Sequence, residues 1–324
     1  MKHISLVISI FLALLLLASC GSRTDGGTPN AGQTQGQIQE QSGNGAASET
    51  HSRSTLVDEG NCGSDMTWQF YEDGTLEITG TGEMWDYGTS LLAGNFSPWK
   101  IKYADRIRNL VLGDGITSIG SAAFYECTSL EGGLRIPAGV TSIGNHAFDR
   151  CSGLTGSLTI PDSVTMIGEY AFSECTGLSG SLTIPDSVTG IGSGAFYGCT
   201  GFSGSLTIGR NVQKIGAGAF HGCSGFTGQL IIPDGVAYIG LQAFLTCSGF
   251  TSGLTIPSGL RTIEQETFRG CSGLTGSLTI PASVTTIKSG AFHGCSGFTG
   301  VLTIPDNVAV EWEAFEGCGF SNQP

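Results

Sequence analysis

Cysteine is the residue whose spacing in this 324-residue chain most invites a chemical role, because thiolates bind metal ions and thiols form disulfides. Metal sites need ligands at short spacing, yet the sequence has no CxxC pair, and its histidines supply no ligand spacing beside the cysteines. Nine of the eleven cysteines instead recur every 24 residues, with 23 before the last: Cys127, Cys151, Cys175, Cys199, Cys223, Cys247, Cys271, Cys295 and Cys318.

This regular spacing predicts a column of buried thiols. Neighbouring cysteines of a stacked array lie about 5 Å apart, within the Cα range of a disulfide, but parallel side chains keep their sulfurs side by side at the repeat spacing. Buried thiols pack as small hydrophobic groups. We therefore expect free thiols in this column, no metal and no cofactor, while Cys62 is either free or bridged.

Neither catalysis nor nucleic-acid binding finds support in the sequence. It contains no GxSxG, HExxH or GxxxxGK[ST] motif, and its paired acids Glu264 and Glu266 flank a repeat turn. A formal net charge of -13 without a basic run disfavours binding to nucleic acid, because phosphate contacts need clustered lysine and arginine. We expect neither an enzyme nor a nucleic-acid-binding protein.

The elements that position the cysteines repeat with the same period, which is typical of a solenoid. In the unit CSGLTGSLTIPDSVTMIGEYAFSE, residues 157–160 alternate polar and apolar side chains, which predicts a short strand that Pro161 ends. Residues 164–167 predict an irregular arc, and residues 171–178 a short helical turn. The strands should form one parallel sheet over a core of stacked phenylalanines: Phe124, Phe148, Phe172, Phe196, Phe220, Phe244, Phe268, Phe292 and Phe315.

The amino terminus reads as a processing signal. Residues 1–19 contain one lysine and a long apolar run, and the run is too short and wrongly flanked for a spanning helix. Residues 17–20, LASC, resemble a bacterial lipobox, which implies cleavage before Cys20 and lipid attachment to its sulfur. The alternative is an ordinary secretory peptide with a cysteine nearby. Residues 20–55 are polar and glycine-rich, and they predict a disordered, lipid-anchored tether.

The repeat unit resembles the BspA-like leucine-rich repeat, with its leucine-x-isoleucine-proline, then valine, isoleucine-glycine and alanine-phenylalanine before cysteine. The resemblance implies a right-handed solenoid of nine repeats over residues 107–324, with a parallel β-sheet on the concave face and short helical or 3-10 turns on the other side. Residues 56–106 resemble that family's N-terminal β cap, and alternation around Glu72–Gly74 predicts a β-hairpin there. Trp312, in the shortened ninth repeat, is a candidate cap for the other edge.

If the sheet lines the concave face, the residue between the two buried apolar ones of each strand is the candidate ligand contact. These residues are mostly threonine, which is also simply a good exposed strand residue; Arg135 and Ile231 are the distinctive ones. The residues after each phenylalanine, such as Tyr125 and His221, form a second candidate surface. The first set, below called the threonine face, comprises Arg135, Thr159, Thr183, Thr207, Ile231, Thr255, Thr279 and Thr303.

The resemblance implies a protein-binding adhesion module on the outer surface of the bacterial cell envelope, attached to the membrane only through its N-terminal lipid. The implied partners are host matrix or plasma proteins, such as fibronectin or fibrinogen, or another microbe's surface. Two alternatives remain open: a passive envelope spacer, and an ice-active array of Ser-x-Thr hydroxyls, which would require a flat sheet.

Overall fold

The computed structural model describes residues 54–90 and 94–322. The predicted signal peptide (1–19), the lipid-attachment residue Cys20 and nearly all of the predicted tether (20–55) lie outside the described residues. The chain divides into two units after Thr50, and the structure described below is that of the second. In the described ranges, no helix is long and apolar enough to cross a membrane.

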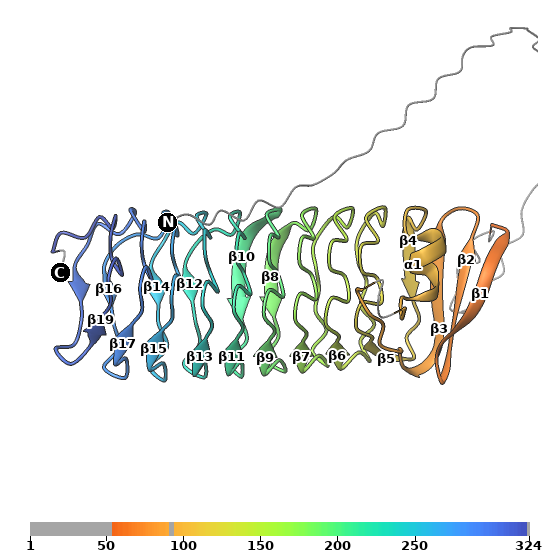
Figure 1. Cartoon of the computed structure of the whole chain (residues 1–324), viewed down its shortest axis with the longest axis horizontal. Coiled ribbons are helices and arrows are strands. Elements are labelled where there is room, and N and C mark those ends of the chain that lie inside the picture. Colours follow the sequence, from red (N-terminus) through yellow and green to blue (C-terminus); the bar gives the residue numbers. More distant parts are fainter. Residues whose placement is uncertain (1–53, 91–93, 323–324) are drawn as a thin grey trace, which may run out of the picture. The chain divides into compact units, whose positions relative to one another are not determined.

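The second unit begins with a small β structure that continues into the repeats. Strands β1 (Leu56–Gly63), β2 (Asp65–Tyr71) and β3 (Thr75–Glu83) are antiparallel, with β2 and β3 joined in a hairpin. Strand β3 also pairs in parallel with β4 (Asn109–Leu112) and β5 (Ile116–Ile119) of the first repeat. The single helix of the described residues, α1 (Pro98–Tyr103), lies beside these strands (Figure 1).

The repeats are turns of a parallel β-solenoid that stand side by side along its axis (Figure 1). Each turn has two strand positions, so the strands form two columns. The first column contains the leucine-x-isoleucine segments: β8 (Gly180–Ile184), β10 (Phe202–Ile208), β12 (Leu230–Ile231), β14 (Leu254–Thr255), β16 (Leu278–Thr279) and β18 (Leu302–Thr303). The second contains β5 and then β6 (Ser142–Ile143), β7 (Met166–Ile167), β9 (Gly190–Ile191), β11 (Lys214–Ile215), β13 (Tyr238–Ile239), β15 (Thr262–Ile263), β17 (Thr286–Ile287) and β19 (Ala309–Val310).

The more continuous sheet runs through the second column, where the sequence predicts only an irregular arc. It extends without interruption from the cap to β13, whereas the first column consists of separate two-stranded pairs, preceded by isolated bridges such as Thr159↔Thr183. A proline without an N–H follows most first-column strands and ends the pairing there. Glycines such as Gly168 follow the second column, and a Cβ at that position would lie 2.6 Å from the backbone N of Asn145, so glycine permits the close approach.

The segment around each phenylalanine is a run of tight turns with 3-10-type hydrogen bonds. The Cys151 N–H donates to the Phe148 carbonyl three residues earlier, at 3.1 Å. The Phe148 N–H donates instead to the Ala171 carbonyl of the next turn, at 2.8 Å. His146 and Arg150 have φ angles of 55° and 62°, in the left-handed region, which prevents the turns from continuing as a helix.

The N-terminal cap supplies donors for the first of these turns. The Trp99 Nε1–H donates to the Ala123 carbonyl at 2.8 Å, and the Tyr87 N–H donates to the Ser121 carbonyl at 2.8 Å. The Trp99 ring also stacks on Phe124, with centroids 5.7 Å apart. Trp99 therefore closes both the hydrogen-bond ladder and the apolar core of the first repeat.

The predicted phenylalanine core is confirmed. From Phe124 to Phe315 the rings form one buried stack with centroids 5.1–5.5 Å apart and nearly parallel planes. The 24-residue period brings each ring over the preceding one, and the shortened last turn keeps the stack, with the ring centroids of Phe292 and Phe315 5.2 Å apart.

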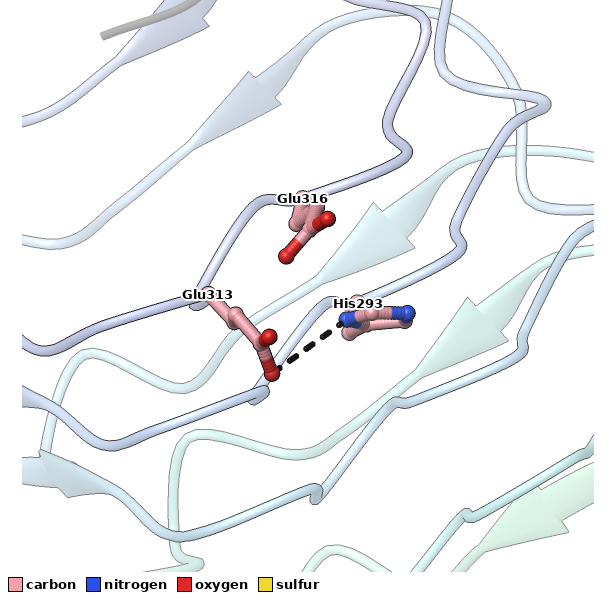
Figure 2. Close-up of side chains that lie close together, drawn as sticks. All are labelled: His293, Glu313 and Glu316. Carbon is pink, nitrogen blue, oxygen red and sulfur yellow. Dashed lines mark ion pairs between the residues drawn. The ribbon is translucent and has the colours of Figure 1, made fainter.

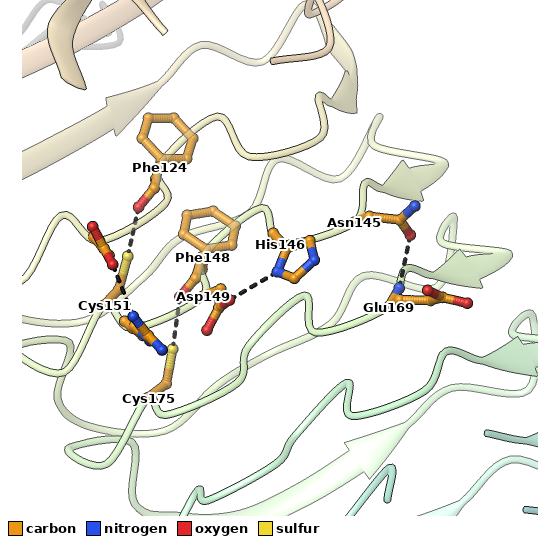
Figure 3. Close-up of polar contacts among 10 residues, drawn as sticks. Phe124, Asn145, His146, Phe148, Asp149, Cys151, Glu169 and Cys175 are labelled. Atoms are coloured by element: carbon orange, nitrogen blue, oxygen red, sulfur yellow. Dashed lines mark hydrogen bonds and ion pairs between the residues drawn. The ribbon is translucent and has the colours of Figure 1, made fainter. Parts of the chain in front are cut away.

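The predicted column of free, buried thiols is also confirmed. Each Sγ–H from Cys151 onward donates to the carbonyl of the phenylalanine in the preceding turn, as Cys151 does to Phe124 at 3.0 Å and Cys175 to Phe148 at 3.1 Å (Figure 3). The same carbonyl of Phe124 accepts the N–H of Cys127 in its own turn, at 3.1 Å. One carbonyl thus joins two successive turns, and cysteine fits because it is small, apolar and able to donate.

We expect the buried thiols to make the fold sensitive to alkali. Burial raises the pKa of Cys127 and of Cys271 from 9.0 to about 12. Above pH 9 the unfolded chain loses these protons while the folded chain keeps them, so the folding equilibrium constant should fall about tenfold per pH unit for each thiol. This loss begins near pH 9 and ends near pH 12. Urea unfolding in reducing buffer between pH 7 and 10.5 measures the slope.

Cys271→Ala is the control, because it removes one titrating thiol while the Phe244 carbonyl keeps its bond from the Cys247 N–H. The variant should lose about 1 kcal/mol at pH 7 and show a shallower decline above pH 9. Equal slopes in the two proteins would contradict the linkage.

Candidate protein-interaction face

The threonine face is an exposed line of side chains along the first strand column. Thr159 is exposed, while its neighbours Leu158 and Ile160 are 4% and 5% exposed. The other seven predicted residues are likewise exposed. The side chains line up because equivalent residues of successive turns are partners in the parallel pairing. These partners are Thr159↔Thr183, Thr183↔Thr207, Ile231↔Thr255 and Thr279↔Thr303.

Hydroxyl groups give most of this face a polar character. Beside the threonines, Ser181 and Ser205 share a hydrogen bond of 3.4 Å between their Oγ atoms. The Gln229 amide donates to the Thr255 hydroxyl at 3.3 Å. Ile231, 52% exposed, interrupts the hydroxyls with an apolar side chain. The face therefore offers both hydrogen-bonding groups and a single apolar contact at its middle.

Arg135 is paired at the N-terminal end of the face. Its guanidinium contacts the Asp114 carboxylate at 2.7 Å, and the two side chains are 67% and 80% exposed. Such an exposed pair contributes little to stability and is readily exchanged for a partner's carboxylate. Arg135 is thus available to a ligand, although it lies four turns from Ile231 in the sequence.

Two adjacent hollows lie beside the middle of the face. The first, about 510 Å³, is lined by Thr183 and Thr207, and the second, about 530 Å³, by Arg210; both are also lined by Asp186. Arg210 and Asp186 form an ion pair of 2.9 Å between the hollows. The surface next to Thr183 and Thr207 is therefore indented and charged.

The hollows coincide with a departure from the repeat that the sequence interpretation did not use. Gly209 stands where the neighbouring repeats have Pro185 and Pro233. A Cβ at Gly209 would lie 2.4 Å from the Pro185 carbonyl oxygen, so the chain approaches the preceding turn closely. The following Arg210 N–H donates to the Asp186 carboxylate at 2.9 Å. In the sequence, the change from TIPDS at residues 183–187 to TIGRN at residues 207–211 is the signal that could have indicated this feature.

The second candidate surface, formed by the residues after each phenylalanine, is largely covered. Asp149 and Ser173 are buried, and only Glu316 is fully exposed. The Asp149 carboxylate contacts Nδ1 of His146 at 2.8 Å (Figure 3), and the His146 ring stacks on Tyr170 at 5.0 Å. These side chains mainly pack turn against turn, which favours the threonine face as the contact surface.

The outward direction of Ile231 can be tested against its neighbour. Ile231→Thr gives this turn the residue found in neighbouring turns and should change the free energy of unfolding by less than about 0.5 kcal/mol. Ile232 is 1% exposed, so Ile232→Thr should cost about 2–3 kcal/mol by burying a hydroxyl in the core. Chemical unfolding of both variants measures the difference. A larger loss of stability in Ile231→Thr than in Ile232→Thr would mean that Ile231 is the buried side chain, which would contradict the structure.

A search of curated proteins finds no match. Similar solved structures include a leucine-rich repeat protein from Eubacterium ventriosum (22% identity, covering 83% of this chain and 97% of that chain, TM-score 0.37). A second is a leucine rich cell surface protein from Faecalibacterium prausnitzii (22% identity, covering 86% of this chain and 97% of that chain, TM-score 0.37). A third is a leucine-rich repeat protein from Bacteroides ovatus (21% identity, covering 79% of this chain and 91% of that chain, TM-score 0.40).

The sequence model of one family matches most of the second unit. The family is described as BspA type leucine rich repeat region (6 copies), and the matches span residues 101–227 and 202–322. These spans contain both strand columns beyond the cap and the phenylalanine and cysteine columns. The chain therefore belongs to the BspA-type leucine-rich repeat family.

Proposed function

We propose that the chain is a surface-displayed protein-binding module that contacts its partner through the threonine face. The observation that carries this proposal is the register of that face: side chains from successive turns stand exposed in one line between buried neighbours. From Thr159 to Thr303 the line makes six steps of about 4.8 Å, roughly 29 Å in all. That length suits a standard interface of about 800 Å² per partner.

The chemistry of the face suits a protein better than an anionic polymer. Arg135 and Arg210 are the cations on or beside it, and each is paired with an aspartate. Threonine and serine hydroxyls can donate and accept hydrogen bonds to a partner's backbone and side chains. Ile231 and the hollows beside Thr183 and Thr207 provide apolar contact and shape at the centre, where interface energy usually concentrates.

The cellular location in this proposal is inferred from the sequence. Cys20 would carry a lipid, residues 20–55 would form the tether, and the repeats would be held outside the bacterial cell envelope. The partner class is host matrix or plasma protein, such as fibronectin or fibrinogen, or another microbe's surface. The module binds and does not catalyse; a passive spacer is the competing function.

Binding of the full chain to immobilised fibronectin and fibrinogen tests the proposal. Thr207→Tyr places a bulky, uncharged side chain beside the hollow and should weaken binding about tenfold or more, as loss of a central contact does. Ile231→Ala should weaken it less. Both variants should fold normally, since the altered side chains are exposed.

Thr262→Tyr is the matched control, because it makes the same change on β15 of the second column. It should leave binding unchanged. If both variants lost binding affinity equally, or if neither lost any, the threonine face would be rejected as the contact surface. Failure of the unaltered chain to bind any matrix, plasma or microbial-surface protein would favour the spacer.

A further inference from the structure

A group of three potential metal ligands lies at the C-terminal end of the solenoid (Figure 2). His293 belongs to one turn, and Glu313 and Glu316 belong to the next, which is the last turn in the described part of the chain. One nitrogen of His293 and one carboxylate oxygen of each glutamate lie within 4.8 Å of one another. We propose that these three side chains bind a divalent transition-metal ion that joins the last two turns.

The local backbone explains why the three side chains meet. The Glu316 N–H donates to the Glu313 carbonyl at 3.2 Å, so the two glutamates flank one tight turn. The Phe292 and Gly294 N–H groups on either side of His293 donate to the Ala314 and Glu316 carbonyls at 2.7 Å. These backbone bonds hold the imidazole beside both carboxylates before any ion binds.

The imidazole itself provides an independent sign of a missing ligand. Nδ1 of His293 is buried and has no hydrogen-bond partner among the described residues. Its nearest acidic atom is Oε2 of Glu313, at 3.9 Å, too far for a hydrogen bond. A buried nitrogen without a partner is costly. An ion between Nδ1 and Oε2 would satisfy both atoms.

The ligand set selects the class of ion. Imidazole nitrogen favours zinc, cobalt, nickel or copper over calcium and magnesium, which prefer oxygen ligands. One histidine and two glutamates supply three ligands, which leaves one position of a zinc site for water. Zinc bonds to nitrogen and oxygen are about 2.0–2.2 Å long, so the three atoms must draw together by about 1 Å. The exposed Glu316 side chain is free to move in this way.

The chain contains a natural control in the same register. His221 follows its phenylalanine as His293 does, and its flanking N–H groups bond to the turn containing Gln242 and Leu245. Those two residues replace the two glutamates, so this histidine has no matching carboxylate pair. Sequence inspection around the cysteines missed the site at His293, because its other ligands are glutamates 20 and 23 residues later.

Titration of the full chain with Zn²⁺ by calorimetry, after removal of metal with a chelator, tests the proposal. One ion should bind per chain, and excess Zn²⁺ should raise the thermal midpoint by mass action. Glu313→Gln with Glu316→Leu reproduces the residues facing His221 and should weaken this binding at least about tenfold, as should His293→Ala. Co²⁺ absorption should show nitrogen and oxygen coordination without a thiolate charge-transfer band.

His221→Ala should leave affinity and stoichiometry unchanged. Undiminished Zn²⁺ binding in the His293→Ala variant, a thiolate band with Co²⁺, or no binding by the unaltered chain at 1 mM Zn²⁺ would each overturn the proposal. Circular dichroism of each variant verifies that the altered, surface-lying turn still folds, so loss of binding is assigned to loss of a ligand.

Discussion

The phenylalanine carbonyl is the group on which the repeat depends. It accepts the N–H of the cysteine in its own turn and the Sγ–H of the cysteine in the next. Both bonds are buried, and the phenylalanine ring attached to the same residue stacks on the rings before and after it. Covalent geometry therefore couples the polar ladder to the apolar stack. The last turn is one residue shorter and keeps both, since Phe315 stacks on Phe292 and the Cys318 Sγ–H donates to the Phe292 carbonyl at 3.1 Å.

Sequence reasoning succeeded where a property depends on a single position in the repeat. The burial of Phe172 and Cys175 and the exposure of Thr159 follow from regular spacing and alternation, and the structure has all three. It failed where the outcome depends on two turns at once. Met166–Ile167 forms a strand because Gly168 lets the preceding turn approach, and a periodicity within one repeat carries no information about that distance.

The candidate sites show the same division. The threonine face could be predicted because each member occupies the same place in its strand. The Asp186–Arg210 pair and the His293, Glu313 and Glu316 group could not, because each joins residues 20–24 apart and includes residues, such as Arg210, that differ from those at the same place in neighbouring repeats. In a regular array, departures of this kind distinguish one part of the surface from another. Comparing units with one another along the same chain would have found them.

In the tight turns around the phenylalanines, the backbone hydrogen bonds between turns all run one way, from an N–H to a carbonyl of the following turn. This ladder therefore has an acceptor end and a donor end. The cap blocks the acceptor end, since Trp99 and Tyr87 occupy the carbonyls of Ala123 and Ser121. At the donor end, the N–H groups of Phe315 and Gly317 face no further turn within the described residues. Two copies therefore cannot pair symmetrically through this ladder, and in each copy the cap covers the acceptor end that the donor end of another copy would need.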